Sequence, residues 1–237
     1  LVERLLSRWT PNGRLNLGFR YPAKLGLWPA AALFFVFIWV ENIFPNSAVP
    51  SSLGVWIVAY SFVTWFGMAF FGKHVWLNRA EAFNVLYIFM SGFSPTEVRI
   101  VDGNACDDCP LGCSRVVGDC INCSWCLEKT LEWQINIRPY AIGLARHAPI
   151  GMDGVSFVIL MLAGITFDGF SATPIWYAFE LAALSLSGAL GPLGMIILKT
   201  LWLAGFSAMF LGIYSIFAVL IRYYSRDNMS WTVVAPA

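Results

Sequence analysis

Residues 193–221 read LGMIILKTLWLAGFSAMFLGIYSIFAVLI, and Lys199 is the only charged side chain among them. A helix needs about 20 consecutive apolar residues to cross the hydrocarbon core of a bilayer. The run is longer than that. It therefore predicts a membrane-spanning helix of about 45 Å, which must tilt or extend beyond the hydrocarbon.

Five further apolar runs precede this one, and polar, glycine or proline residues separate them. They cover residues 25–44, 53–71, 82–93, 155–170 and 175–190. The six runs predict an all-α integral membrane protein with about six transmembrane helices, three within residues 25–93 and three within residues 151–222. The run at 82–93 is short for a crossing, so it either borrows residues 75–77 and tilts, or forms a re-entrant or interfacial helix.

The amino-acid composition also indicates a membrane environment. Hydrophobic residues make up 58% of the chain and charged residues 12%, whereas roughly a quarter of a soluble domain is charged. Too few charges remain to cover a water-exposed surface, so lipid is the predicted main partner. A net charge of +1 provides no basic excess, and no nucleic-acid partner is predicted.

Both ends of the sequence are polar. Residues 1–24 carry several arginines and are predicted to form a basic, amphipathic approach to the membrane. Residues 223–237 are predicted to form a polar tail, which we expect to be incomplete. The chain begins with Leu1 rather than Met, which indicates processing or a longer polypeptide.

Basic residues near the runs predict the orientation in the cell membrane. Lys73, Arg79 and Arg222 should face the cytoplasm together with the amino-terminal segment. If all six runs cross, the polar segment at residues 94–150 lies outside the cytoplasm. If the third run does not cross, this segment changes sides.

All six cysteines lie in residues 94–150, which are predicted to form an extramembrane loop. They are Cys106, Cys109, Cys113, Cys120, Cys123 and Cys126. Thiols this close together are either cross-linked or bound to metal, because free thiols oxidise. The oxidising environment outside the cytoplasm favours three disulfides, whose pairing the spacing alone does not give.

Two metal interpretations stay open beside the disulfides. Cys106-x2-Cys109 and Cys120-x2-Cys123 match the paired CxxC pattern of a tetrahedral zinc site, which leaves the other two cysteines over. The last three cysteines, at CxxCxxC spacing, suggest an iron–sulfur cluster, although Thr130 stands where the usual fourth cysteine would be. Zinc ranks above iron–sulfur.

Charged side chains within or beside the apolar runs are candidates for an intramembrane site. Asp168 and Glu180, together with His74, are predicted to form an ion or proton site. The structural alternative is that Asp168 shapes a turn while Glu180 meets a neighbouring helix. The two histidines, His74 and His147, both lie at membrane edges, so no haem is expected.

Three stretches point to a family. They are YPAKLGLWPA at residues 21–30, WLNRAEAF at 76–83 and TFDGFSATP at 166–174. In this order they resemble a family of bacterial and archaeal multi-spanning membrane proteins labelled fenitrothion hydrolase-like. The resemblance implies hydrolysis of organophosphate esters but assigns no catalytic residue. No GxSxG, HExxH or P-loop pattern occurs, so sequence motifs indicate no enzyme.

Three functions follow as hypotheses. The leading one is a non-catalytic membrane subunit or anchor of a larger complex, in which the cysteine loop docks partner membrane subunits. The second is an ion-coupled transporter that uses Glu180 and Asp168. The third is the membrane-bound ester hydrolase that the resemblance implies.

Overall fold

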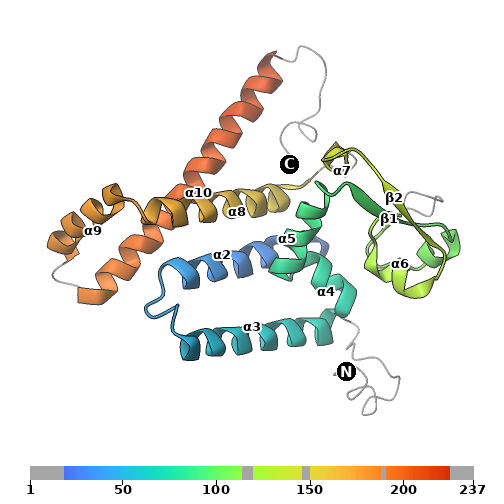
Figure 1. Ribbon diagram of the computed structural model, residues 1–237, viewed down its shortest axis with the longest axis horizontal. Helices are drawn as coiled ribbons and strands as arrows, with labels where there is room; N and C mark the ends of the chain where they lie inside the picture. The colour runs from blue at the N-terminus through green and yellow to red at the C-terminus, as the bar shows by residue number, and fades with distance from the viewer. Residues whose placement is uncertain (1–18, 114–119, 146–149, 188–190, 225–237) are drawn as a thin grey trace. The chain divides into compact units, whose positions relative to one another are not determined.

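The computed structural model describes residues 19–113, 120–145, 150–187 and 191–224, which are mostly helical (Figure 1). The predicted tail at 223–237 and approach at 1–24 therefore lie largely outside the described residues. The chain divides into two compact units. Unit 1 comprises Leu1–Leu25 and Tyr60–Ala148, and unit 2 comprises Gly26–Ala59 and Pro149–Ala237.

Four helices in the described part of the chain are long and apolar enough to cross a membrane. They are α2 (Trp28–Asn42) extended by the 3-10 turn η1 (Ala23–Leu25), α3 (Pro50–Phe71), α8 (Met152–Ser171) and α10 (Gly191–Tyr224). Apolar side chains on these helices are widely exposed; Val55 and Phe66 of α3 are 68% and 62% exposed. Such surfaces are consistent with a membrane protein, since water would penalise them.

The other two predicted spans form shorter helices, so six crossings are not seen. The third run forms α5 (Ala82–Ser91), ten residues or about 15 Å long. It cannot borrow residues 75–77, because they belong to a separate helix, α4 (Lys73–Arg79). Glu81 separates the two helices, and its carboxylate caps α5 by accepting hydrogen bonds from the first backbone N–H groups. The fifth run forms α9 (Pro174–Ser187), 14 residues long.

In unit 2, α2 and α8 pack side by side and run in the same direction (Figure 1). At their amino-terminal ends the backbone N–H of Leu27 donates to Asp153 Oδ2 at 2.6 Å. One turn or more further on, the rings of Phe34 and Phe157 lie 5.1 Å apart. Towards the other ends, Gly164 leaves space that the Ile38 side chain fills. The matched sequence of contacts establishes that the pair is parallel.

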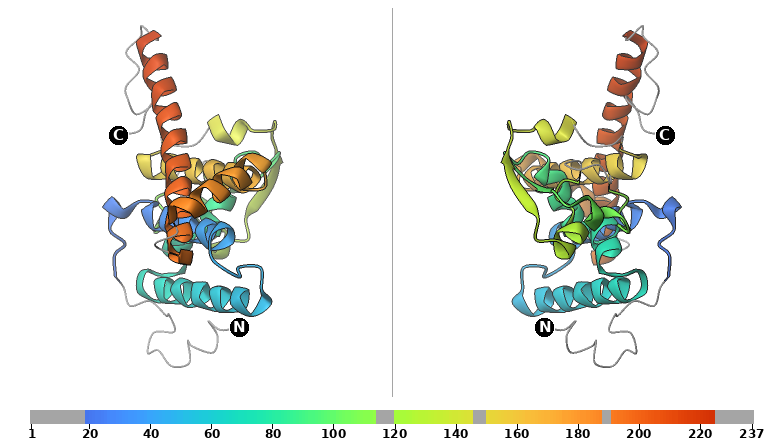
Figure 2. Two further views of the ribbon diagram at one scale, coloured as in Figure 1. Left: turned by 90° about the vertical axis from the view of Figure 1, so that its left-hand side faces the viewer. Right: turned by 90° about the vertical axis from the view of Figure 1, so that its right-hand side faces the viewer.

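The helix α10 packs against α8 in unit 2 through its first half. The Phe206 ring lies 5.6 Å from Phe167 and 5.3 Å from Phe170, near the carboxyl end of α8. Trp39 Nε1 of α2 donates to Thr200 Oγ1 at 2.8 Å. Figure 2 shows α10 as one unbroken helix. Its 34 residues correspond to a length of about 51 Å, so the predicted long final helix is confirmed.

In unit 1, α3 ends where Gly72 adopts a positive φ of 85°, and α4 begins at the next residue. After α5, strands β1 (Thr96–Ile100) and β2 (Trp133–Ile137) form an antiparallel pair in which Val98 faces Ile135. Between the strands lie the 3-10 turn η2 (Gly103–Cys106) and α6 (Ser124–Lys129), and α7 (Ile142–Ala145) follows β2. The segment that was predicted as an extramembrane loop thus contains a short antiparallel sheet, which the all-α prediction did not include. We call β1 to β2, residues 96–137, the cysteine module.

A candidate metal centre in the cysteine module

The second half of the module places one cysteine beside β1 and the other two at the start of α6. The Cys120 carbonyl accepts a hydrogen bond from Ile100 N–H at 3.1 Å. Asn122 then adopts a positive φ of 52°, donates its N–H to the Val98 carbonyl at 2.8 Å, and accepts from Val98 N–H through its side chain at 2.9 Å. This turn leads into α6, with Cys123 at its N-cap and Cys126 in its first turn.

The first half of the module places the other three cysteines on tight turns. Asp102 caps η2 by accepting from Asn104 N–H at 3.0 Å, and η2 ends at Cys106. Cys109 N–H then donates to the Cys106 carbonyl at 3.2 Å. The Gly112 N–H donates to Cys109 at 3.1 Å, with φ at 72°. A positive φ suits glycine, so the turn delivers the next residue, the third cysteine of the half, back towards the first two.

All six thiols converge in the module, and none of them is disulfide-bonded. Their sulfurs form two groups of four, and within each group all ligand atoms lie within 4.8 Å of one another. The groups are Cys106, Cys113, Cys120 and Cys126, and Cys109, Cys113, Cys123 and Cys126. The predicted zinc grouping is therefore corrected: the two cysteines that it left over belong to both groups.

Cysteines make up most of the interior of the module. Its buried cluster consists of Ile100, Ala105, Cys106, Cys120, Cys123 and Cys126. Cys126 is fully buried and Cys120 is 2% exposed. A segment this short cannot build a stable hydrophobic core, and small domains of this kind usually depend on disulfides or metal. The buried thiols of this module could hold a metal ion.

The sulfur spacing suits single tetrahedral ions. Ligands at the usual zinc–sulfur distance of about 2.3 Å lie roughly 3.8 Å apart at the corners of a tetrahedron. Cys109 and Cys123 sulfurs are 3.7 Å apart, and Cys113 and Cys126 sulfurs are 3.3 Å apart. A four-iron cluster binds each cysteine through a different iron, which spreads the four sulfurs further. The compact spacing is thus closer to that of four ligands around one ion than to that of a four-iron cluster.

Burial and the neighbouring thiols keep several of these cysteines protonated when no cation is close. Burial, reinforced by neighbouring thiols, raises the pKa of Cys120 to about 12, and the pKa of Cys113 and Cys126 is raised as well. Burial also acts on Cys109, but hydrogen bonds from Cys113 and from the backbone outweigh it and lower its pKa. A metal ion reverses the balance, because it binds the thiolate and displaces the proton.

Polar contacts within unit 1 fasten the module to the helix that follows α3. His74 of α4 is buried; its Nε2 lies 3.0 Å from Glu128 Oε2, and its Nδ1 lies 3.3 Å from Ser124 Oγ. The Lys73 ammonium donates to Glu128 Oε1 at 2.7 Å. Lys73, with a smaller contribution from His74, holds the pKa of Glu128 below its ordinary value despite partial burial. The short helix α6 therefore carries both the Cys126 thiol and the side chains that contact α4.

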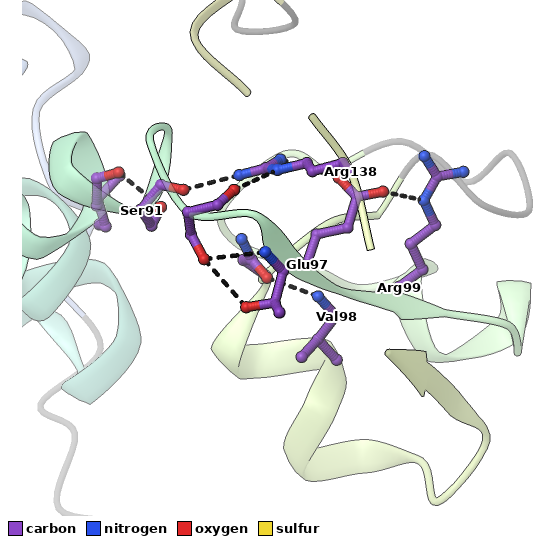
Figure 3. A network of polar contacts seen from close by, with 9 residues as sticks. Ser91, Glu97, Val98, Arg99 and Arg138 are labelled. Atoms are coloured by element: carbon purple, nitrogen blue, oxygen red, sulfur yellow. Dashed lines mark hydrogen bonds and ion pairs between the residues drawn. The ribbon is translucent and has the colours of Figure 1, made fainter. Parts of the chain in front are cut away.

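A buried ionic network joins the two strands of the module to the end of α5 (Figure 3). Sequence reasoning did not predict it. Arg138 donates through Nη1 to Glu97 Oε2 at 2.9 Å, through Nη2 to the Ser91 carbonyl at 2.7 Å, and through Nε to the Ser94 carbonyl at 2.9 Å. Arg99 Nε donates to Glu97 Oε1 at 2.5 Å. Burial alone raises the pKa of Glu97, but the two arginines outweigh it and hold the pKa below its ordinary value.

The predicted ion site at Asp168, Glu180 and His74 stays a prediction. Glu180 is paired with Lys199 at 2.6 Å, which joins α9 to α10 as the structural alternative expects. Asp168 is exposed on α8. His74 belongs to unit 1, where its partners are on α6. No described contact links the three residues.

No protein-family profile matches the chain, and no curated protein or solved structure gives a significant match. The resemblance to fenitrothion hydrolase-like proteins therefore stays a prediction.

Proposed function

We propose that the chain is a membrane anchor subunit that carries a metal-binding cysteine module on the cytoplasmic side of the bilayer. The convergence of six unpaired thiols into two four-sulfur groups is the observation that carries this function. The four long apolar helices would form the anchor, and the module would dock partner subunits.

The parallel packing of α2 and α8 supports the cytoplasmic side. If both helices span the bilayer, they enter it from the same face, so the chain between them crosses an odd number of times. In the described residues between them, α3 has the length for a crossing and the ten-residue α5 does not. The cysteine module would then lie on the side where α2 begins, instead of outside the cytoplasm as predicted from six crossings.

Basic residues agree with this assignment. In a four-span arrangement Lys24, Lys73, Arg79 and Arg222 all flank the membrane on the module side. The turn between α2 and α3, residues 43–49, has no lysine or arginine and faces the opposite side. This is the asymmetry that positively charged cytoplasmic loops produce.

Compartment and geometry together favour metal over disulfides. Cytoplasmic thiols are kept reduced, so a cysteine-rich segment there is more often metal-binding than cross-linked. Soft thiolates select zinc, copper(I) or iron–sulfur clusters. Zinc suits the compact four-sulfur groups best, because it requires neither redox chemistry nor bridging sulfide. It would act as a structural ion that replaces the missing hydrophobic core.

Exposed apolar side chains on the module support a docking role. Leu131, Ile135 and Ile137 are 94%, 61% and 88% exposed, although they lie outside the long apolar helices. Ile135 and Ile137 alternate along β2 and so share one face of the hairpin, and exposed apolar faces often mark a binding surface. A partner subunit that covers this surface fits the anchor function better than a lone monomer does.

Metal analysis combined with thiol counting tests the proposed function. The chain would be purified in mild detergent without added metal, and bound metal would be measured together with thiols that react under native conditions. We expect a bound divalent ion and thiols that react only after chelation or denaturation. A metal-free preparation in which the cysteines are oxidised to disulfides would overturn the proposal.

A further inference from the structure

We propose that the cysteine module holds two metal ions, bridged by the thiolates of Cys113 and Cys126. The inference rests on the proposed metal-binding function and extends it to the number of ions and the role of each ligand. The juxtaposition that carries it is the sharing of these two sulfurs by both four-sulfur groups.

The two halves of the module contribute to the groups in the same way. Each half carries three cysteines, at CxxCx3C spacing in the first half and CxxCx2C in the second. One group takes the first cysteine of each half, and the other group takes the second; both groups also take the third cysteine of each half. Equivalent positions in the two halves thus have equivalent roles, so each ion would receive the same pair of positions from both halves.

The six sulfurs supply the bonds that two tetrahedral ions need. Each of the two ions requires four bonds. Cys106, Cys109, Cys120 and Cys123 supply one bond each, and the two shared thiolates supply two each, so every position is filled. The shared sulfurs are 3.3 Å apart, which is compatible with the common edge of two tetrahedra. Six protons leave the thiols when two divalent ions bind.

A single ion would leave part of the cluster without a role. If only the first group were filled, Cys109 and Cys123 would remain as thiols with their sulfurs 3.7 Å apart. Cys123 is buried, at 9% exposure, and is the N-cap of α6. In the sequence it lies between Cys120 and Cys126, which both belong to the first group. A second ion uses both thiols, needs no change of fold, and neutralises two further charges of the thiolate cluster.

Two measurements on the full chain loaded with zinc test the proposal. They are the number of zinc ions bound per chain, and X-ray absorption spectroscopy at the zinc edge, which reports the zinc–zinc distance. We expect about two zinc ions per chain and a zinc–zinc distance of roughly 3 Å, which follows from two ions with ordinary zinc–sulfur bonds on a shared edge. One ion per chain without a zinc–zinc signal would overturn the bridged site while leaving the proposed function intact. No zinc at all would overturn both.

Two matched substitutions separate shared ligands from unshared ones. Cys109 and Cys113 are both partly buried and differ in whether one group or both include them. We expect Cys109→Ser to retain one ion and Cys113→Ser to retain fewer than one. Equal losses from the two variants would contradict the bridging role. The stoichiometry and zinc–zinc distance of the unmodified chain decide the proposal even if a variant fails to fold.

Discussion

Glu97 is a buried carboxylate whose neighbours keep it charged. It is 2% exposed, and both of its oxygens accept hydrogen bonds from arginines. Arg138, itself 8% exposed, also donates to the carbonyls of Ser91 and Ser94 and so ties the end of α5 to the hairpin. Removing one charge from such a network leaves the partner buried and unpaired, which costs far more than an exposed ion pair contributes.

We therefore expect Glu97→Gln to lower the stability of unit 1 by about 3 kcal/mol at neutral pH. The pKa of Glu97 is lower in the folded chain, so its contribution is complete above the ordinary carboxyl pKa of about 4.3 and is lost as the pH falls through the folded value. Thermal unfolding in detergent, compared between variant and parent across pH, measures both effects.

Glu132→Gln is the control for this substitution, because Glu132 is an exposed carboxylate of the same module. It should change the unfolding temperature little. A Glu97→Gln variant as stable as Glu132→Gln, or a gap that widens below pH 4, would contradict the role of the network.

His74 and Lys73 contact the same carboxylate but differ in burial. His74 is 8% exposed, whereas the side chains of Lys73 and Glu128 are 39% and 55% exposed. We expect His74→Ala to loosen α6 by about 1–3 kcal/mol, because it removes a buried ring that packs edge-on against Trp125 of α6 at 5.0 Å. Lys73→Ala should cost less than about 1 kcal/mol, as exposed ion pairs do. Hydrogen exchange of residues 124–129 measures the difference, and equal effects would show that the buried contact is unimportant.

At the scale of elements, the approach of α2 to α8 depends on a glycine. A Cβ built on Gly164 would lie 2.5 Å from Ile38 Cδ1, whereas a Cβ on Gly169 of the same helix would meet nothing within 4 Å. Both positions are helical, so replacing either glycine brings a similar gain in helix propensity. The difference between the two substitutions therefore reports the packing alone.

We expect Gly164→Leu to destabilise unit 2 by about 1–3 kcal/mol relative to Gly169→Leu, because the larger side chain forces the helices apart. Unfolding of the two variants in the same detergent provides the comparison. If the two variants have the same unfolding midpoint, the close parallel packing of α2 on α8 is not a stabilising contact.

For the whole molecule, the direction of each spanning helix determines which compartment the cysteines meet. One protease site inserted at the exposed turn Asn46–Ala48 and another at Leu131–Glu132 report the two sides. In sealed, right-side-out vesicles, we expect cleavage at the first site alone, and at the second only after detergent is added. Six crossings would expose both sites from outside, so cleavage at Leu131–Glu132 in intact vesicles would contradict the four-span arrangement.

The sequence alone was sufficient to predict where the four long apolar helices lie and that one segment holds the six cysteines. Hydrophobicity and residue identity are local properties of the chain. Local sequence did not show that Glu81 lies between two helices and caps the second, so it left open whether residues 82–93 cross or form a re-entrant or interfacial helix. It also did not show which sulfurs meet, or that Glu97 and Arg138 pair across 41 positions. Those features depend on contacts between distant segments, as does the shared direction of α2 and α8. Only the folded chain brings such segments together, and so only the tertiary structure could decide them.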